Sequence, residues 1–354
     1  MTPMFVPGPV DVSPEVLAAQ ARPMLPHRSK EFEAIFQRTE EKARKLFATQ
    51  RQVFQATASG SGMQEAGIRN FVDRTVLCCV NGAFSQRWHD VAVCNGKDAE
   101  VLAVDYGEAV SPDLLADALK KKPYEAVTIV HNETSTGVEN PLEELCAAVQ
   151  QTSPDTLVLV DAVSSLGGVK IEMDAWGIDF LLTSSQKCLA LPPGLSLAAA
   201  SERAMKKAEM VPNRGWYFDL LLMEKHRLKD STPMTPAMAL VFALDVQLDR
   251  ILEEGLENRF ARHAVMAGRV QKWAEDQDMP PLALPGVRSK TVTSLVNKRC
   301  FAVAELNKFL LARGMRVANG YGPLREKNFR IAHMGETQLE DIEALLVTIE
   351  EFCS

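Results

Sequence analysis

The sequence lacks the positive charge that a protein binding nucleic acid or an anionic membrane surface needs. Its 46 Asp and Glu outnumber its 39 Lys and Arg, and the formal net charge is −7. Both partners require a basic face, so neither is expected. No apolar run approaches the roughly 20 residues of a membrane-spanning helix. The opening residues MTPMFVPGPV have no basic stretch followed by an apolar one, so no secretory signal is expected either.

The seven cysteines show neither the paired spacing of a zinc site nor the even number of a disulfide scaffold. No metal site is therefore predicted. A reducing cytoplasm is the simplest location for a soluble chain of this kind. The cysteines are Cys78, Cys79, Cys94, Cys146, Cys188, Cys300 and Cys353.

The pattern of apolar residues is typical of an α/β protein. The 354 residues leave room for two packed domains. A Pro- and Gly-rich arm (1–14) precedes a large domain (15–254), in which short apolar runs alternate with amphipathic helices. Strands that are apolar on both faces and separated by helices predict a mostly parallel sheet covered on two sides. The candidate strands are 75–80, 100–104, 126–131, 156–161, 180–183 and 194–200.

The remaining residues, 255–354, predict a smaller α+β domain. Helices are expected at 258–276, 301–313 and 338–352, and strands at 290–296, 316–318 and 328–333. In the large domain the spacing predicts helices at 31–47, 112–122, 142–151 and 236–254, with Ser111 as an N-cap and Pro112 in the first helical position.

Two residues that follow predicted strands carry the densest chemical signal. Asp161 ends the run TLVLVD, and Lys187 comes just after the end of the next strand. Ligands of open α/β sheets lie beyond the carboxyl ends of the strands. Pyridoxal 5′-phosphate (PLP) needs such a pair, a lysine to form an imine and an acid to keep the pyridine nitrogen protonated. The alternative is that Asp161 caps a loop and Lys187 is a surface lysine.

A Gly- and Ser-rich turn, ASGSG at 58–62, lies directly before a helical stretch at 63–71. Glycines let the backbone approach an anion, and a helix N-terminus presents free N–H groups to a phosphate. The turn has neither the spacing of a P-loop nor that of a dinucleotide-binding fingerprint. It suits the phosphate of PLP, and the alternative is an ordinary tight turn.

Ten short motifs in one order resemble the alanine–glyoxylate and serine–pyruvate group of class V aminotransferases, which have the fold-type I architecture. The resemblance runs from about residue 5 to 350. It implies a large PLP-binding domain with a sheet of the seven-stranded type. The motifs are Pro7-Gly8-Pro9, His27-Arg28-Ser29, Ser59-Gly60-Ser61 with Glu65-Ala66, Asn81-Gly82-Ala83-Phe84, Glu133-Thr134-Ser135-Thr136-Gly137, Asp161-Ala162-Val163-Ser164-Ser165, Ser185-Gln186-Lys187, Pro192-Pro193-Gly194, Thr235-Pro236 and Asn328-Phe329-Arg330-Ile331.

The resemblance also implies roles for single residues. Lys187 is expected to bind the cofactor as a Schiff base and to move the proton at the substrate α-carbon, and Asp161 to pair with the pyridine nitrogen. The other cofactor ligands expected are Phe84 stacked on the ring, Thr134 near the ring hydroxyl, Gln186 in the pocket wall, and Ser59, Gly60 and Ser61 on the phosphate. A plain core phenylalanine is the alternative for Phe84.

Substrate and partner roles follow in the same way. Arg330 is expected to grip the substrate α-carboxylate through its planar guanidinium, and Gly8 of the arm to face that carboxylate. A strand arginine held in a salt bridge is the alternative for Arg330. Thr235 would reach the phosphate of a neighbouring subunit, which implies a homodimer with shared active sites. The sequence departs from the family pattern at two positions: Thr232 stands where some relatives have Tyr, and Ser61 stands where many have Thr or His.

Other enzyme classes fit less well. A PLP lyase or cysteine desulfurase on the same fold typically has His before the lysine and a cysteine on a mobile loop. Here Gln186 precedes the lysine, Cys188 is tethered beside it, and Cys300 is expected to be a small buried residue. A nicotinamide enzyme would need GxGxxG after a strand, and none occurs. A non-catalytic protein that kept the fold would not need Lys187, Asp161 and Arg330 together.

The substrate is the least determined point. Alanine or serine as donor and glyoxylate or pyruvate as acceptor fit the resemblance, and phosphoserine or aspartate are alternatives on the same scaffold. Four further residues offer either a second anionic pocket or ordinary surface charges: Arg22, His27, Arg28 and Arg325.

Overall fold

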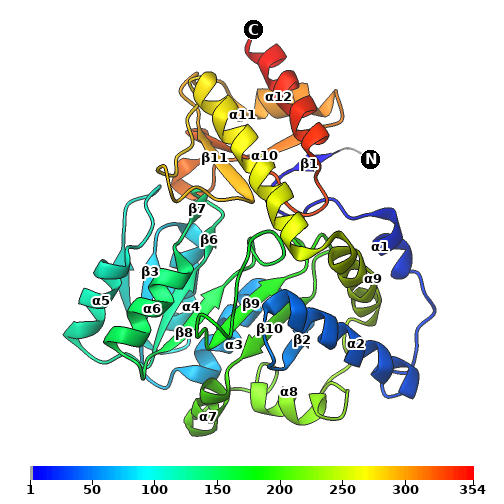
Figure 1. Ribbon diagram of the computed structural model, residues 1–354, viewed down its shortest axis with the longest axis vertical. Coiled ribbons are helices and arrows are strands. Elements are labelled where there is room, and N and C mark those ends of the chain that lie inside the picture. Colours follow the sequence, from blue (N-terminus) through cyan, green and yellow to red (C-terminus); the bar gives the residue numbers. More distant parts are fainter. Residues whose placement is uncertain (1–2) are drawn as a thin grey trace.

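The structure, a computed structural model, describes residues 3–354, which form two lobes, each with its own sheet (Figure 1). The larger sheet has seven strands in the order β2-β10-β9-β8-β5-β3-β4. β10 runs antiparallel to both of its neighbours, and the pairs from β9 to β4 are all parallel, as predicted. The strands are β2 (Val53–Ala56), β3 (Thr75–Val80), β4 (Asp98–Ala103), β5 (Ala126–Val130), β8 (Leu157–Asp161), β9 (Phe180–Ser184) and β10 (Ser196–Ala200).

All six strands expected in the large domain are present, and β2 is the strand of the seven-stranded sheet that the pattern missed. β2 has only four residues, and Gln55 interrupts its apolar run although that side chain is buried. The expectation that every strand is apolar on both faces is wrong for β4. That strand is the edge of the sheet, so most of its side chains, Glu100 and Val101 among them, are exposed.

Helices cover both faces of the large sheet, and a separate apolar core lies under each set. One face is covered by α2 (Lys30–Phe47), α5 (Pro112–Lys121), α6 (Leu142–Thr152) and α9 (Met238–Glu254), with α1 (Pro14–Ala19) beside α9. The other face carries α3 (Gly60–Phe71), α4 (Ala83–Cys94), α7 (Glu202–Met210) and α8 (Leu220–Arg227). Ser111 caps α5 with Pro112 in its first turn, which confirms that prediction.

The small lobe, at the top of Figure 1, contains β1 (Met4–Phe5), β11 (Val292–Val296), β12 (Arg316–Asn319), β13 (Asn328–Ala332), α10 (Leu256–Asp276), α11 (Val303–Leu311) and α12 (Leu339–Cys353). Its strand order is β1-β12-β13-β11. The N-terminal strand β1 pairs in parallel with β12, so the arm is tied to the C-terminal part of the chain. The predicted helices and strands of this region are all found. The turn η1 (Gly322–Leu324) and the short strands β6 (Asn132–Glu133) and β7 (Val138–Glu139) complete the described elements.

The predicted arm, 1–14, includes residues 1 and 2, which lie outside the described residues. Its last residue, Pro14, is already the first residue of α1. The predicted division at residue 254 falls beside Gly255, which separates α9 from α10. These domain boundaries stay predictions.

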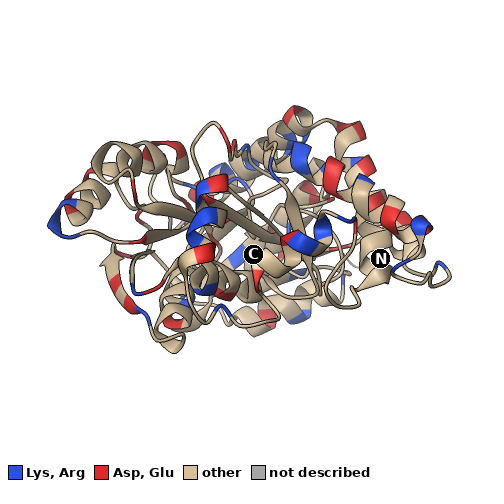
Figure 2. Cartoon of the chain, turned by 90° about the horizontal axis from the view of Figure 1, so that it is seen from below, with Lys and Arg blue, Asp and Glu red and all other residues tan. Residues whose placement is uncertain are grey.

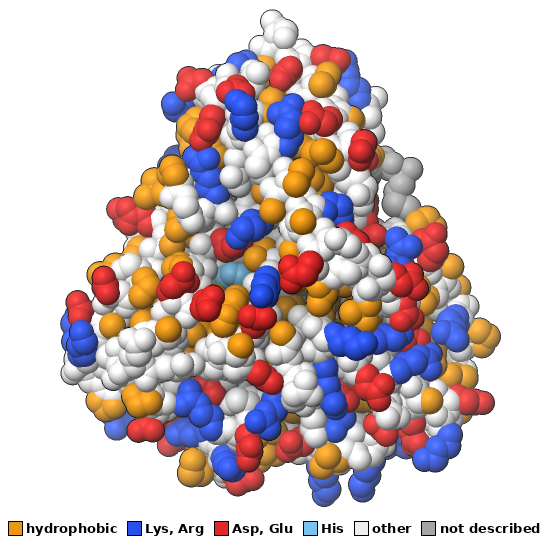
Figure 3. Space-filling view, in the orientation of Figure 1, with side chains coloured by type: hydrophobic (Ala, Val, Ile, Leu, Met, Phe, Trp, Pro, Cys, Tyr) orange, Lys and Arg blue, Asp and Glu red, His pale blue; other side chains and the backbone are white. Residues whose placement is uncertain are grey.

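The surface mixes charges of both signs. Basic and acidic residues are interspersed along the outer helices (Figure 2), and the face in Figure 3 shows both signs scattered among apolar side chains. Among the described residues, no helix has the length and apolar character needed to cross a membrane.

Candidate active site

A cavity of about 350 Å³ lies beyond the carboxyl ends of β5, β8 and β9. It brings together most of the residues that the sequence singled out, although they come from widely separated segments. A larger cavity of about 920 Å³, lined largely by α10 and residues 139–144 and 285–290, contains none of them. The smaller cavity is lined by nine of the predicted site residues: Gly8, Ser59, Gly60, Ser61, Phe84, Thr134, Asp161, Gln186 and Lys187.

Lys187 follows β9 and directs its amine into the cavity toward the carbonyl oxygen of Pro7. Removal of the amine from water disfavours its charged form and, helped by the positive charge of Arg330, lowers the pKa of Lys187 to about 8. A larger share of this lysine than of an exposed one is therefore the neutral, nucleophilic amine near neutral pH.

Asp161 is the last residue of β8, and its carboxylate is buried at the base of the same cavity. Gln64 Nε2 donates to one carboxylate oxygen at 2.7 Å, and the backbone N–H of Val163 donates to the other at 2.8 Å. Burial nevertheless raises the pKa of Asp161 to about 6. The two hydrogen bonds hold the carboxylate in one orientation, facing a cavity that also contains a cationic lysine.

The start of α3 forms a cradle suited to an anion. Ser59 is the N-cap residue, with extended backbone and no hydrogen bond from its side chain to the helix, so its hydroxyl is available to a ligand. The backbone N–H groups at a helix N-terminus and the helix dipole favour a phosphate there. The helix begins at Gly60, three residues earlier than predicted. Gly60 and Gly62 have low helix propensity, so the sequence did not indicate that this first turn is helical.

Four buried polar atoms that border the cavity have no hydrogen-bond partner among the described residues. They are the Ser184 hydroxyl and the side-chain carbonyl oxygens of Gln64, Asn132 and Gln186. Buried polar groups are rarely left unpaired, so these atoms point to a polar ligand. Together with the cradle at α3, Lys187 and Asp161, they fit a phosphorylated pyridine aldehyde such as PLP.

Phe84 lies at the start of α4, where a buried carboxylate fixes the backbone. Glu133 accepts hydrogen bonds from the N–H groups of Phe84 at 3.1 Å and Ser85 at 2.9 Å. A negative charge at a helix N-terminus is favourable. The ring of Phe84 borders the cavity and packs 5.2 Å from the ring of Tyr321, a residue of the small lobe. Phe84 is therefore a wall residue of the cavity rather than a plain core phenylalanine.

Arg330 does not line the cavity itself, but its guanidinium lies next to the wall. Nη1 donates to the carbonyl oxygen of Thr134 at 3.2 Å, and Nε donates to that of Asn319 at 3.1 Å. Burial lowers the pKa of Arg330 to about 10. No carboxylate of residues 3–354 lies within salt-bridge distance of Arg330. The alternative, a strand arginine held in a salt bridge, is therefore wrong.

Gly8 lies against the lysine. Its φ of +102° is in the region that favours glycine, and a Cβ at this position would stand 2.6 Å from Cδ of Lys187. The arm is held there by a hydrogen bond of 3.2 Å from the backbone N–H of Val10 to the carbonyl of Gln186. The side of the cavity that carries Lys187 is thus closed by the N-terminal arm.

Thr235 is exposed and does not border the cavity of its own chain. The segment that carries it is attached to the residue that follows β2: the backbone N–H of Ala237 donates to the Thr57 hydroxyl at 2.9 Å. The role predicted for Thr235 in a neighbouring subunit stays a prediction.

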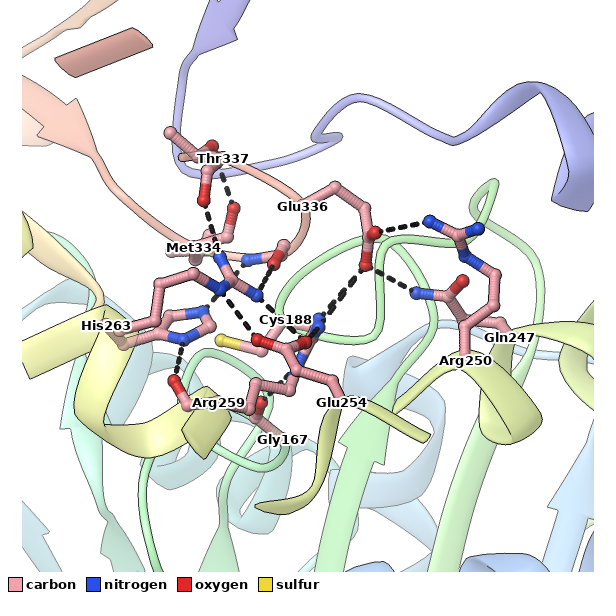
Figure 4. A network of polar contacts seen from close by, with 12 residues as sticks. Gly167, Cys188, Gln247, Arg250, Glu254, Arg259, His263, Met334, Glu336 and Thr337 are labelled. Atoms are coloured by element: carbon pink, nitrogen blue, oxygen red, sulfur yellow. Dashed lines mark hydrogen bonds and ion pairs between the residues drawn. The ribbon is translucent and has the colours of Figure 1, made fainter. Parts of the chain in front are cut away.

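A buried ion-pair network lies behind the loop that carries Lys187 (Figure 4). Arg259, only 1% exposed, donates from Nε to the carbonyl of Gly167 at 2.9 Å and from Nη2 to that of Cys188, also at 2.9 Å. Its charge is balanced by Glu254 at 2.6 Å and Glu336 at 3.3 Å. The network joins the lysine loop to α10 and to the small-lobe loop that contains Glu336.

Sequence reasoning missed several residues of the site. Gln64 follows Gly60 by four positions and Arg87 follows Phe84 by three, so each shares a helix face with a predicted ligand, a signal that helical spacing could have supplied. Tyr321 and Arg259 reach the site only through tertiary contacts.

Of the residues thought to offer a second anionic pocket, none lines the cavity: Arg22, His27, Arg28 and Arg325. The expectation that Cys300 is buried is wrong. It lies exposed in the turn between β11 and α11, with a φ of +54°.

Comparison with known proteins identifies the family of the chain. The family model described as aminotransferase class-V matches residues 13–321. An uncharacterized aminotransferase of Methanocaldococcus jannaschii is 38% identical, covering 98% of this chain and 91% of its own. The L-aspartate–glyoxylate aminotransferase of Paracoccus denitrificans is 33% identical over 97% of this chain and 88% of its own. The crystal structure of an alanine–glyoxylate aminotransferase from Nostoc sp. superposes with a TM-score of 0.93 at 30% identity, covering 99% of this chain and 95% of that one.

Proposed function

Because the chain belongs to the class-V aminotransferase family and is a transaminase, we propose that it moves the amino group of alanine or serine to a 2-oxoacid such as glyoxylate or pyruvate. The cavity with Lys187, Asp161 and the neighbouring Arg330 carries this proposal. A glyoxylate-using relative and a glyoxylate-using structural neighbour, each at least 30% identical over nearly the whole chain, support the acceptor.

The proposed cofactor is PLP, on which fold-type I aminotransferases generally depend. The phosphate would be held by the start of α3, with Ser59, Gly60 and Ser61, and the ring would lie between Phe84 and the strand ends, with Thr134 and Gln186 at its edge. When bound, PLP supplies an aldehyde and an electron-withdrawing ring that weakens the C–H bond of the substrate α-carbon.

Lys187 has two tasks in this proposal. Its amine, whose pKa is lowered to about 8, would hold the cofactor covalently. When free, the same Nζ would take the proton from the substrate α-carbon and later return it. The N-terminal arm lies against the lysine, with the carbonyl oxygen of Pro7 facing Nζ, which would limit exchange of this proton with solvent.

Asp161 and Arg330 set the electrostatics and the orientation. The Asp161 carboxylate, oriented by Gln64, would hold the proton on the pyridine nitrogen. The guanidinium of Arg330 would bind the substrate α-carboxylate, and its planar fork fixes the angle of the α C–H bond to the ring. Phe84 would cover one ring face and exclude water from it.

A homodimer and a cytoplasmic location belong to the same proposal. Thr235 is exposed close to the phosphate cradle, and the nearby Trp216 is 62% exposed, which suits a surface covered by a second subunit. All seven cysteines are free thiols, in keeping with a reducing compartment. The lyase or desulfurase alternative has less support, because no cysteine of the described residues lines the cavity.

A panel of donors and acceptors tests the proposal. Purified protein with added PLP is expected to transaminate alanine or serine with glyoxylate, and Lys187→Ala is expected to abolish turnover while circular dichroism stays native. Arg330→Met should mainly raise the KM for the donor and lower kcat/KM about 10- to 100-fold. Turnover retained by Lys187→Ala would refute the assignment of the lysine, and sulfide release from cysteine would favour the desulfurase.

A further inference from the structure

A second arginine that sequence reasoning did not find borders the same cavity. Arg87 projects from the first turns of α4, and its guanidinium lies over the ring of Phe84, 4.8 Å from the ring centroid. Its Nη2 donates to the Tyr321 hydroxyl at 2.9 Å, and its Nη1 is 3.5 Å from the Ser61 hydroxyl. The side chain is half-buried, so a small ligand in the cavity can reach it.

Arg87 has no acidic partner. Within residues 3–354 no carboxylate lies within salt-bridge distance of its guanidinium, whereas most arginines of the chain are paired. The 3.5 Å contact with Ser61 is at the limit of a hydrogen bond. A guanidinium that faces a cavity and still has N–H donors without a partner is suited to bidentate recognition of a carboxylate or phosphate.

Tyr321 connects Arg87 with Arg330. The Tyr321 hydroxyl accepts from Arg87, while the guanidinium carbon of Arg330 lies 5.6 Å from the centroid of the same ring. One cation thus contacts the hydroxyl of Tyr321, and the other lies over its ring. A ligand whose first carboxylate lies on Arg330 would turn its far end toward Tyr321 and Arg87.

We propose that Arg87, held by Tyr321, forms a second anion subsite that binds the distal carboxylate of a short dicarboxylic amino acid or oxoacid, while Arg330 binds the α-carboxylate. This inference rests on the proposed transaminase function and narrows its substrate class. It extends that function from small neutral donors to four-carbon dicarboxylic ones. Each carboxylate of a dicarboxylic substrate needs a cationic partner. Arg330 is assigned to the α-carboxylate, and Arg87 is the arginine of residues 3–354 that lines the cavity and can bind the distal one.

The same chemistry could serve the cofactor phosphate, because Ser61 belongs to the phosphate cradle. The cradle, however, already contains a helix N-terminus and the free hydroxyls of Ser59 and Ser184. The firm contact of Arg87 is instead with Tyr321, on the small-lobe hairpin that carries Arg330. This contact favours the substrate over the cofactor.

Calorimetric titration of the PLP-loaded enzyme with succinate and with butyrate tests the subsite without relying on turnover. The two compounds have the same chain length and differ in the second carboxylate. Wild-type protein is expected to bind succinate about 10-fold or more tightly than butyrate, as for a charge-assisted contact. Arg87→Met should remove most of that preference, and Tyr321→Phe should reduce it by less. Arg325→Met, which removes an exposed arginine of the same small-lobe loop, is the matched control and should keep the preference.

Three results would overturn the subsite. The first is equal binding of succinate and butyrate by the wild type. The second is an equal loss of affinity for both in Arg87→Met. The third is weaker PLP retention on dialysis of Arg87→Met with the succinate preference intact, which would assign the arginine to the cofactor phosphate. A succinate preference that depends on Arg87 in a protein without transaminase activity would uphold the subsite and refute the proposed function.

Discussion

Arg259 donates a hydrogen bond of 2.9 Å from Nη2 to the carbonyl oxygen of Cys188, the residue that follows Lys187. The two preceding carbonyls also accept hydrogen bonds, that of Gln186 from the N–H of Val10 and that of Lys187 from the N–H of Ala190. The loop is thus fixed by the arm, by its own turn and by α10. The position of the lysine depends on contacts far from it in sequence.

Arg259→Met should destabilise the protein by about 3 kcal/mol, because it leaves the carbonyls of Gly167 and Cys188 without their buried donor. It also takes one cation from Glu254 and Glu336, which keep Arg262 and Arg250. The lysine loop should loosen as well, so PLP should dissociate faster from the variant. Urea unfolding and the rate of cofactor loss on dialysis measure the two effects. Arg269→Met, which breaks a half-exposed pair with Glu343, is the control and should cost well under 1 kcal/mol. Equal losses in the two variants would contradict this role.

The rate at which PLP attaches to the apoprotein should rise with pH and level off above about 8. The neutral amine of Lys187 is the reacting form, and burial together with the charge of Arg330 lowers the pKa of this lysine to about 8. In Arg330→Met one of these two causes is removed, so the midpoint should move to higher pH. Stopped-flow absorbance at a series of pH values gives the midpoints. A midpoint that does not move would show that Arg330 has no influence on the lysine.

Gly8→Ala should lower transaminase activity about 10-fold or more. The new methyl group would meet the Lys187 side chain at 2.6 Å, and the backbone strain at a φ of +102° would add about 1–2 kcal/mol of destabilisation. Gly286→Ala separates the two effects, because Gly286 has a φ of +89° but open space around its Cβ position. Similar stability losses with activity lost only at Gly8 are the expected result. An active Gly8→Ala enzyme would remove the arm from the lysine side of the cavity.

Acid should destabilise the protein through His333. Burial lowers the pKa of His333 to about 4, and its ring contacts the Thr293 hydroxyl at 2.9 Å and the Lys290 carbonyl at 3.1 Å. Between pH 6.5 and about 4 the unfolded chain therefore binds a proton that the native protein does not. The free energy of unfolding should fall by about 1.4 kcal/mol per pH unit for this group as the pH drops, and no effect is expected above the unfolded pKa.

Urea titrations of His333→Gln across that range should show a shallower fall than the wild type. His226→Gln, at a half-buried position on α8, is the control. Parallel curves for all three proteins would show that His333 carries no proton linkage.

The sheet and the central pair of residues could be predicted because their signals are local. Apolar runs mark buried strands, and in an open α/β sheet the residue after a strand lies at the ligand edge, so position alone made Asp161 and Lys187 candidates. Their roles came from the resemblance to the class V aminotransferases. β2 was missed because it is short and carries a glutamine. The order of the strands and the single antiparallel strand β10 depend on pairing between distant segments, which no local pattern encodes.

The rest of the site depends on contacts between lobes. Arg87 and Gln64 could have been proposed from helical spacing, but only once α3 and α4 were placed with their first turns at the cavity. Tyr321 meets Phe84 across the two lobes, and Arg259 reaches Cys188 from α10. These contacts between residues far apart in sequence are determined by how the two lobes pack. The sequence therefore predicted which groups line the cavity better than which groups hold them in place.

The pairing of β1 with β12 also constrains how the protein is made. Met4 pairs with Arg316, so this strand pair joins segments that are far apart along the chain. The small sheet cannot form its β1–β12 pair until residues 316–319 have left the ribosome. A nascent chain stalled before that point is expected to contain the strands of the large sheet while its small sheet is still incomplete.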